Sequence, residues 1–273
     1  MDLELFKKIF KYNERSAIPM ENRVKVERID ENNYDRIFAI SDLHGQYDLF
    51  LRLLEKIELK REDLLLILGD ICDRGKKSYE IYMKCMKMIK LGYNLKFILG
   101  NHEDMFNLAL KEARYNVLDS RRQDHYFRNN GLTTLQSFYP EATIKNRRYY
   151  FKKFAREYKK LRLWLKKLQT RYESWDYYFV HAGVDFNKNF WNQEHRDIVW
   201  IREPYLSSDK KYDKKIFHGH SPVREEPYYD IRENRINIDG GCVYGGKLNI
   251  VIINEDGSIL FQQSKQLEED IYK

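Results

Sequence analysis

Residues 64–75 read LLLILGDICDRG, five consecutive aliphatic residues followed by a turn rich in glycine and aspartate. A short apolar run that ends at such a turn is typical of a strand buried on both faces of a sheet. Two similar stretches flank it, RIFAISDLHG at 36–45 and LKFILGNHE at 95–103, and a helical pattern follows each of the three. The repeated order of strand, turn and helix predicts an α/β fold with parallel strands joined by right-handed crossovers.

The second half of the chain predicts more strands than helices. No strand is expected between residues 105 and 172, because Lys145–Leu168 carries leucine, aromatic and basic residues at roughly helical spacing. Five short apolar runs then predict strands, and Asp256-Gly257 is a favourable hairpin turn between the last two. These runs are Tyr177–Val180, Lys215–Phe217, Arg235–Ile238, Leu248–Ile253 and Ile259–Gln263. A second sheet packed on the first would bury the apolar faces of both.

The same pattern predicts one main domain with two peripheral ends. Residues 1–34 are expected to form a short helix over Leu3–Tyr12 and a polar connector. The main domain is expected at 35–265, with a helical insertion at about 105–172, and residues 266–273 are expected to form a tail.

Composition excludes several classes of protein. Of the 273 residues, 42% are apolar, which suffices for a sizeable core. The longest aliphatic run, Leu64–Leu68, is far shorter than the ~20 residues of a membrane span, so no membrane partner is expected. The N-terminus lacks the apolar stretch of a secretory signal, and three scattered cysteines cannot form a disulfide framework. A cytoplasmic protein is expected, and its oligomeric state stays open.

Basic residues set the sign of the net charge, which is +7. Lysine and arginine are densest in Arg147–Arg171, which we interpret as a solvated helix face rather than a nucleic-acid surface. A positive field would favour any phosphorylated substrate.

Polar side chains follow the predicted strands at the point where each strand ends. Ser41–Gly45, Gly69–Gly75 and Gly100–Glu103 follow the first three strands, and histidines follow two later ones, in Val180–Gly183 and Phe217–His220. The carboxyl ends of neighbouring parallel strands open onto one crevice, so we expect these clusters to converge. One such loop alone is usually capped by its own side chains, whereas five favour a shared site.

The side chains in these clusters indicate a metal centre. Carboxylate, carboxamide and imidazole ligands together suit manganese, iron or zinc better than magnesium or calcium. Asp42 and His44 would lie beside one ion, Asn101 and the later histidines beside another, and Asp70 could bridge two ions about 3.5–4 Å apart. Two cations would lower the pKa of a shared water toward neutrality and so provide hydroxide.

The motifs, in this order, resemble those of the metal-dependent phosphoprotein phosphatases, which are a branch of the calcineurin-like metallophosphoesterases. The resemblance is to the bacterial and phage serine/threonine phosphatases of this family in particular. The family pattern of G-D-x-H-G, G-D-x-x-D-R-G, G-N-H-E, H-A-G and G-H extends over residues 36–253, and Ile238–Leu248 resembles a closing strand segment of those members. The resemblance implies two mixed β-sheets packed face to face and flanked by helices, an α/β/β/α sandwich.

The resemblance also implies roles for individual residues. It assigns the first ion to Asp42, His44 and Asp70, and the second to Asp70, Asn101, His181 and His220. Manganese is the expected ion, with iron or zinc as alternatives. His102 would be the general acid, and its hydrogen bond to the Asp73 carboxylate should favour the protonated imidazole. The residues implied to bind the substrate are Arg74, Arg202, Asn101 and His102.

A few positions depart from the family pattern or stay open. Ser41 replaces the first glycine, which should disturb the backbone approach slightly without removing a ligand. His218 competes with His220 for ligand status, and the glycine before His220 favours the latter. Tyr244 would either reach the substrate or pack under the last turn. Three residues are set aside as surface or packed side chains: His125, His195 and Cys72.

The expected reaction is hydrolysis of a phosphomonoester by direct attack of a metal-bridging hydroxide, without a phosphoenzyme. Phosphoserine or phosphothreonine in proteins is the first expected substrate, because Asp73 and Glu103 complete the motifs as in the protein phosphatases. The alternatives are symmetrical cleavage of diadenosine tetraphosphate, or a broad specificity that includes nucleotides or RNA ends. A phosphate-binding or nucleic-acid-binding module on the same fold is a further possibility, which the basic segment Lys145–Arg171 would support.

Overall fold

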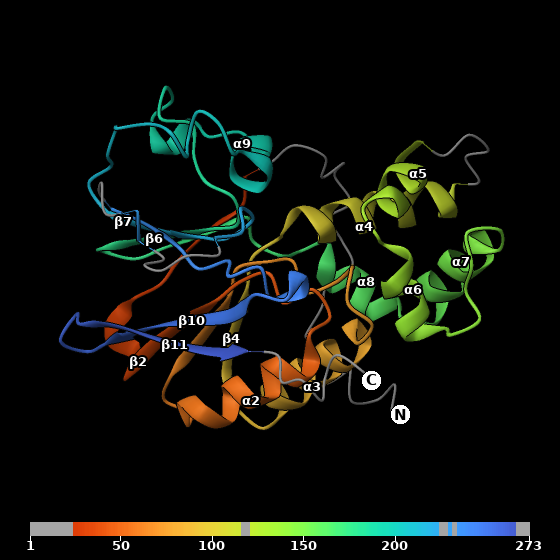
Figure 1. Cartoon of the computed structure of the whole chain (residues 1–273), viewed down its shortest axis with the longest axis horizontal. Helices are drawn as coiled ribbons and strands as arrows, with labels where there is room; N and C mark the ends of the chain where they lie inside the picture. The colour runs from red at the N-terminus through yellow and green to blue at the C-terminus, as the bar shows by residue number, and fades with distance from the viewer. Residues whose placement is uncertain (1–23, 116–120, 224–228, 231–233, 266–273) are drawn as a thin grey trace.

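A computed structural model describes residues 24–115, 121–223, 229–230 and 234–265. Figure 1 shows two stacked sheets, with α2 and α3 below the lower sheet and α9 above the upper one. The α/β/β/α architecture expected from the sequence is therefore confirmed. The helix expected at 3–12 and the tail at 266–273 lie outside the described residues. Among the helices of the described ranges, none has the length and apolar character needed to cross a bilayer.

The lower sheet has five strands in the order β11, β10, β2, β3, β4. Its strands are β2 (Arg36–Ile40), β3 (Leu64–Ile67), β4 (Asn94–Phe97), β10 (Lys247–Asn254) and β11 (Ile259–Lys265). The strands β2, β3 and β4 pair in parallel, and β10 runs antiparallel to both β2 and β11. The crossovers between the parallel strands are the helices α2 (Tyr47–Ile57) and α3 (Ser78–Lys90).

Strand β2 shows why the central strands are apolar at every position. Phe38 and Ile40 belong to the core cluster that contains residues of α2 and α3, whereas Ile37 and Ala39 belong to the cluster between the two sheets. Successive side chains of a strand point to opposite faces, so a strand covered on both sides needs apolar residues throughout. The expectation of doubly buried strands is confirmed for β2 and β3, whereas the edge strand β4 has one exposed and two half-buried residues.

The upper sheet has six strands in the order β1, β5, β6, β7, β9, β8. Its strands are β1 (Val26–Arg28), β5 (Arg171–Glu173), β6 (Tyr177–Val180), β7 (Lys215–His218), β8 (Tyr229–Asp230) and β9 (Arg235–Asn237). Strands β6, β7 and β9 are parallel, so β6 and β7 end at the same edge. The sequence analysis did not predict the strands β1, β5 and β8. The segment before residue 35, expected as a connector, contributes β1 and the short helix η1 (Glu31–Asn33).

Helices form most of the chain between β4 of the lower sheet and β5 of the upper sheet. They are α4 (Asn101–Arg114), α5 (Arg121–Arg128), α6 (Leu132–Phe138), α7 (Arg147–Glu157) and α8 (Lys159–Leu165). The remaining helices are α9 (His195–Trp200) and the short helices η2 (Phe190–Asn192) and η3 (Cys242–Tyr244). We call the stretch from α5 to α8 the helical lobe, which extends to the right of the sheets in Figure 1.

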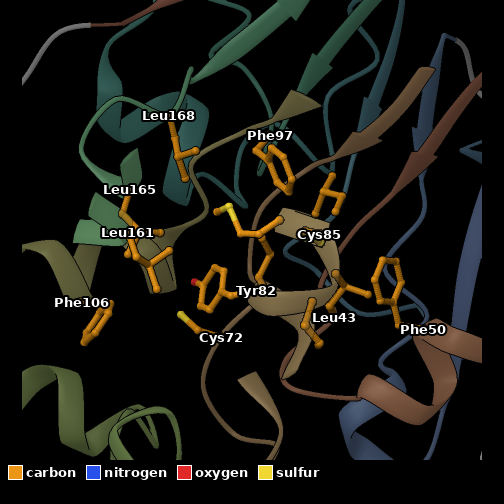
Figure 2. Close-up of a cluster of buried hydrophobic side chains, with 14 of the residues drawn as sticks. Leu43, Phe50, Cys72, Tyr82, Cys85, Phe97, Phe106, Leu161, Leu165 and Leu168 are labelled. Atoms are coloured by element: carbon orange, nitrogen blue, oxygen red, sulfur yellow. The ribbon is translucent and has the colours of Figure 1, made fainter. Parts of the chain in front are cut away.

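The helical lobe shares one core with the lower sheet. Figure 2 shows Leu161 and Leu165 of α8 on the same side of the cluster as Phe106, facing Tyr82 and Cys72. These side chains belong to a single buried cluster that continues under the lower sheet. The lobe therefore packs against the sheet whose strand ends carry the polar motifs.

Candidate metal centre and acid pair

The polar loops of both sheets meet at one place. The backbone N–H of His44 donates to the carbonyl of Asp70 (2.8 Å), and the N–H of His220 donates to Oδ2 of Asp42 (2.9 Å) across 178 positions of sequence. The N–H of Gly219 donates to the carbonyl of His181 (2.8 Å). The expected convergence of the strand ends is thus observed, and it joins loops from both sheets.

The first group of acceptor atoms comprises Asp42 Oδ1, His44 Nε2 and Asp70 Oδ2. Nδ1 of His44 donates to the carbonyl of Cys72 (2.8 Å), which leaves Nε2 as an acceptor in the neutral ring. Burial, followed by nearby His102 and Arg74, lowers the pKa of His44, so the neutral ring is favoured. This Nε2 lies 3.4 Å from Asp70 Oδ2 and 3.9 Å from Asp42 Oδ1.

The second group of acceptor atoms comprises Asp70 Oδ1, Asn101 Oδ1, His181 Nε2 and His220 Nδ1. Nδ1 of His181 donates to the carbonyl of Leu68 (2.8 Å), which leaves Nε2 to face the other atoms of this group. It lies 2.9 Å from Asn101 Oδ1 and 3.5 Å from Asp70 Oδ1. His220 Nδ1 lies 2.9 Å from the same Asn101 oxygen.

These two groups fit a pair of divalent cations. Buried carboxylates are costly without compensating charge, and a cation between them and the ring nitrogens would supply it. Burial, with Asp42 and Glu103 nearby, raises the pKa of Asp70, which is the cost that a bound cation would offset. Asp70 gives one oxygen to each group. The mixture of oxygen and imidazole nitrogen donors favours manganese, iron or zinc over magnesium or calcium.

Unusual backbone conformations hold these side chains in place. Asp42, His44, Asp70 and His220 all have positive φ, between 41° and 66°, in the left-handed region that non-glycine residues rarely adopt. A Cβ atom on Gly100 would lie 2.2 Å from Asp70 Oδ1, so a larger residue there would displace the bridge.

Glu103 fixes the loop that carries Asp70. Its carboxylate accepts the backbone N–H groups of Asp70 (2.8 Å), Ile71 (2.9 Å), Cys72 (3.3 Å) and Gly100 (3.1 Å). The sequence analysis used Glu103 to distinguish between substrates, whereas the structure gives it a buried structural role. Ser41, the departure from the family pattern, donates its hydroxyl to Asp42 Oδ2.

His102 and Asp73 form a buried pair beside the first group. Nδ1 of His102 lies 2.7 Å from Asp73 Oδ2, and Nε2, which has no hydrogen-bond partner in the described parts of the chain, lies 4.0 Å from Asp70 Oδ2. His102, His44 and Asp70 could also hold a metal ion by distance alone, and so could Asp70, His181 and His220. These distances do not separate His102 from the ligands, because a metal-bound imidazole also commonly donates its other N–H to a carboxylate.

The direction of the His102 pKa differs from the expectation. Burial, followed by Arg74 and His181, lowers the pKa of His102 despite the Asp73 carboxylate. Burial also raises the pKa of Asp73 to about 7. Desolvation opposes both charges in this pair, so the protonated imidazole needs added negative charge at Nε2, such as that of a phosphate dianion.

Two guanidinium groups flank the acceptor groups. Nη1 of Arg74 contacts His44 Nε2, and its guanidinium lies over the Tyr244 ring at 5.3 Å from the ring centre. Nη2 of Arg202 donates to the carbonyl of His220 (3.0 Å). Tyr244 is 53% exposed and supports Arg74, an arrangement that the sequence analysis left open.

A groove of about 970 Å³ opens beside Arg202. The helices α4 and α5 form one wall, and α9 with the following turn forms the other. Its lining residues include Asp104, His125, His195, Trp200 and Arg202. His195 Nε2 lies 3.3 Å from Asp104 Oδ2, which links the two walls. The helical lobe therefore lines part of this groove, through Arg122 and His125 of α5.

The contacts of three further residues bear on the sequence analysis. His218 is buried against the Tyr205 ring and falls outside the groups with metal-binding distances in the described residues. Cys72 is fully buried, and burial raises the pKa of its thiol, so it is a packed residue. The sequence analysis did not single out Asp239, a buried carboxylate near Asp42. Burial, followed by Asp42, raises the pKa of Asp239, and its Oδ1 accepts the N–H of Gly241 (3.0 Å).

The chain is similar to known phosphoesterases. A profile described as calcineurin-like phosphoesterase matches residues 35–252. The asymmetrical bis(5′-nucleosyl)-tetraphosphatase PrpE of Bacillus velezensis is 26% identical over 235 residues, 77% of this chain and 85% of the relative. Serine/threonine-protein phosphatase 1 of Salmonella typhimurium is 22% identical over 233 residues, 83% of this chain and 96% of the relative. The crystal structure of a candidate diadenosine tetraphosphatase shares the fold with a TM-score of 0.61 at 18% identity, over 90% of this chain and 100% of the other.

Proposed function

The chain belongs to the calcineurin-like phosphoesterase family, and on this premise we propose that it hydrolyses phosphomonoesters, with phosphoserine and phosphothreonine in proteins as the first substrate class. One observation carries the proposal: two groups of buried acceptor atoms share Asp70. A proton donor and two guanidinium groups lie beside them. Such a combination suits the hydrolysis of phosphate esters. Cations and paired N–H donors stabilise the charge of the transition state, and an acid protonates the leaving group.

The residues of this chain would divide the reaction among them. When bound, a pair of divalent cations supplies Lewis acidity and an activated water. Arg74 and Arg202 present planar paired donors to the phosphoryl oxygens. His102 donates the proton of Nε2 to the leaving oxygen, while its Nδ1 stays hydrogen-bonded to Asp73. No side-chain nucleophile is required.

Cleavage of a dinucleoside tetraphosphate is the second candidate. The Bacillus relative carries the name of such an enzyme. In addition, Glu103 was one basis of the preference for phosphoproteins, but its carboxylate accepts hydrogen bonds from backbone N–H groups. It therefore gives that preference no support through contact with a substrate. The sequence analysis specified symmetrical cleavage, whereas the name of the relative specifies asymmetrical cleavage, so the products decide between them.

A substrate panel tests both candidates. Purified protein with manganese would be assayed for kcat/KM on a phosphoserine peptide, diadenosine tetraphosphate and 5′-phosphorylated single-stranded RNA. We expect the highest value for the phosphopeptide. ADP as the sole nucleotide product would indicate symmetrical cleavage, and AMP with ATP asymmetrical cleavage. Absence of turnover on every substrate would contradict the proposed function.

A further inference from the structure

Two hydroxyl groups from the helical lobe converge on Asp73. The Tyr126 hydroxyl of α5 donates to Asp73 Oδ1 (2.6 Å), and the Thr134 hydroxyl of α6 donates to the same oxygen (2.6 Å). Thr134 Oγ1 in turn accepts the backbone N–H of Asp73 (2.7 Å). All three side chains are fully buried. Oδ1 of Asp73 is thus occupied by two donors, and Oδ2 is left for His102.

The surrounding packing leaves these hydroxyls little freedom. The Tyr126 ring stacks on Phe106 with ring centres 5.5 Å apart. On another side lies Gly131, where a Cβ atom would come within 2.3 Å of the Tyr126 ring. A carboxylate held by three hydrogen bonds from buried donors has a single orientation, since any rotation would break at least one of them.

We propose that Tyr126 and Thr134 are positioning residues for the acid step, acting through Asp73 to aim Nε2 of His102 at the leaving oxygen. This inference rests on the proposed function. The hydroxyls fix Oδ1, the carboxylate plane then fixes Oδ2, and Oδ2 fixes the His102 ring through Nδ1 at 2.7 Å. The helical lobe therefore shapes the chemistry as well as the groove.

The inference makes a prediction about leaving groups. Proton donation matters for a poor leaving group such as the serine alkoxide, and hardly for p-nitrophenolate, which departs as a stable anion. Tyr126→Phe keeps the ring and its stacking but removes the hydroxyl. We expect it to lower kcat on a phosphoserine peptide about tenfold, with kcat on p-nitrophenyl phosphate within about twofold and KM unchanged on both. Thr134→Val should act in the same direction, and Thr134→Ser should restore the rate.

Matched controls exist in the same lobe. The Tyr139 hydroxyl also donates to a carboxylate, but to that of Glu157 in α7 (2.8 Å) and not to Asp73. Tyr139→Phe should leave the ratio of the two rates unchanged, as should Thr133→Val at a half-buried position of α6. In a His102→Asn background, Tyr126→Phe should add less than about a twofold effect, because the two changes act on one step.

A spectroscopic measurement separates failure of this inference from failure of the proposed function. The buried Nδ1–H of His102 should give a low-field proton resonance that Tyr126→Phe shifts and Tyr139→Phe does not. Equal losses on both substrates, or no loss on either, would overturn the positioning role while leaving phosphatase activity established. A wild-type protein that turns over neither substrate would refute the proposed function and the acid step, even if the resonance shifted as expected.

Discussion

The loop from Gly69 to Gly75 and the helices α5 and α6 meet at Asp73, but they are built differently. In the loop, Asp70, Asp73 and Arg74 have φ of 53°, 71° and 67°, and backbone N–H groups bonded to Glu103 hold it in shape. The helices instead contribute side chains from regular turns, fixed by aromatic packing. The loop gathers acceptors, which suits cations, whereas the helices supply donors, which suits control of an acid. Changes on each side should therefore fail in different ways.

The largest effect is expected at the bridge between the acceptor groups. Asp70→Asn removes the charge that both groups share, so we expect turnover to fall by about 10³-fold or more together with loss of bound metal. Elemental analysis and steady-state kinetics measure the two quantities. Asp48→Asn, at a half-exposed carboxylate paired with Lys77, is the matched control. Full metal content in Asp70→Asn would contradict the bridging role.

A smaller effect on chemistry, without metal loss, is expected at the acid. His102→Asn should lower turnover on poor leaving groups by about 10²-fold while metal content stays intact. This result would separate the acid pair from the acceptor groups, which the distances among His44, Asp70 and His102 do not. A parallel loss of metal would place His102 among the ligands instead.

Glu103 tests whether the loop depends on its backbone bonds. Glu103→Gln replaces a carboxylate that accepts four backbone N–H groups by an amide with one acceptor oxygen, so buried donors lose partners. We expect the free energy of unfolding to fall by about 2 kcal/mol, measured by denaturant titration. Glu80→Gln in α3 is the matched control. An unchanged unfolding curve would show that the loop holds its shape without Glu103.

The smallest effect is expected at Tyr244. Tyr244→Ala removes the ring under the Arg74 guanidinium, a contact worth about 0.5–1 kcal/mol at an exposed site. We expect KM for a phosphopeptide to rise about threefold with kcat nearly constant, whereas Tyr244→Phe should retain the wild-type value. A large fall in kcat would indicate direct contact with the reacting phosphate.

Strands buried on both faces were readable from sequence because their apolar runs are unbroken, as in β2 and β3. Strand β5 was not, because its sequence is Arg-Tyr-Glu and each of its charged residues has a partner from another element. Arg28 Nε lies 2.9 Å from Glu173 Oε1, and Nη1 of Arg171 donates to the carbonyl of Phe190 (2.7 Å). Burial of such residues depends on partners far away in the chain, which local pattern does not reveal. The two-residue strand β8 is too short to leave any pattern.

The site shows the same division. The six implied ligands were placed by motifs at strand ends, and the structure brings their side chains together, although their roles stay predictions. Tyr126 and Thr134 gave no signal, because a tyrosine and a threonine inside helical patterns look like packing residues until their distance to Asp73 is known. The division of the chain into a main domain and peripheral ends also stays a prediction.

The dependence of the centre on both sheets has a consequence for synthesis. A nascent polypeptide that has left the ribosome only as far as α8 contains Asp42, His44, Asp70 and Asn101 but neither of the later histidines. Such a chain has the complete first acceptor group and half of the second. If these residues hold the ions, the second position cannot be completed before β6 and β7 have been synthesised.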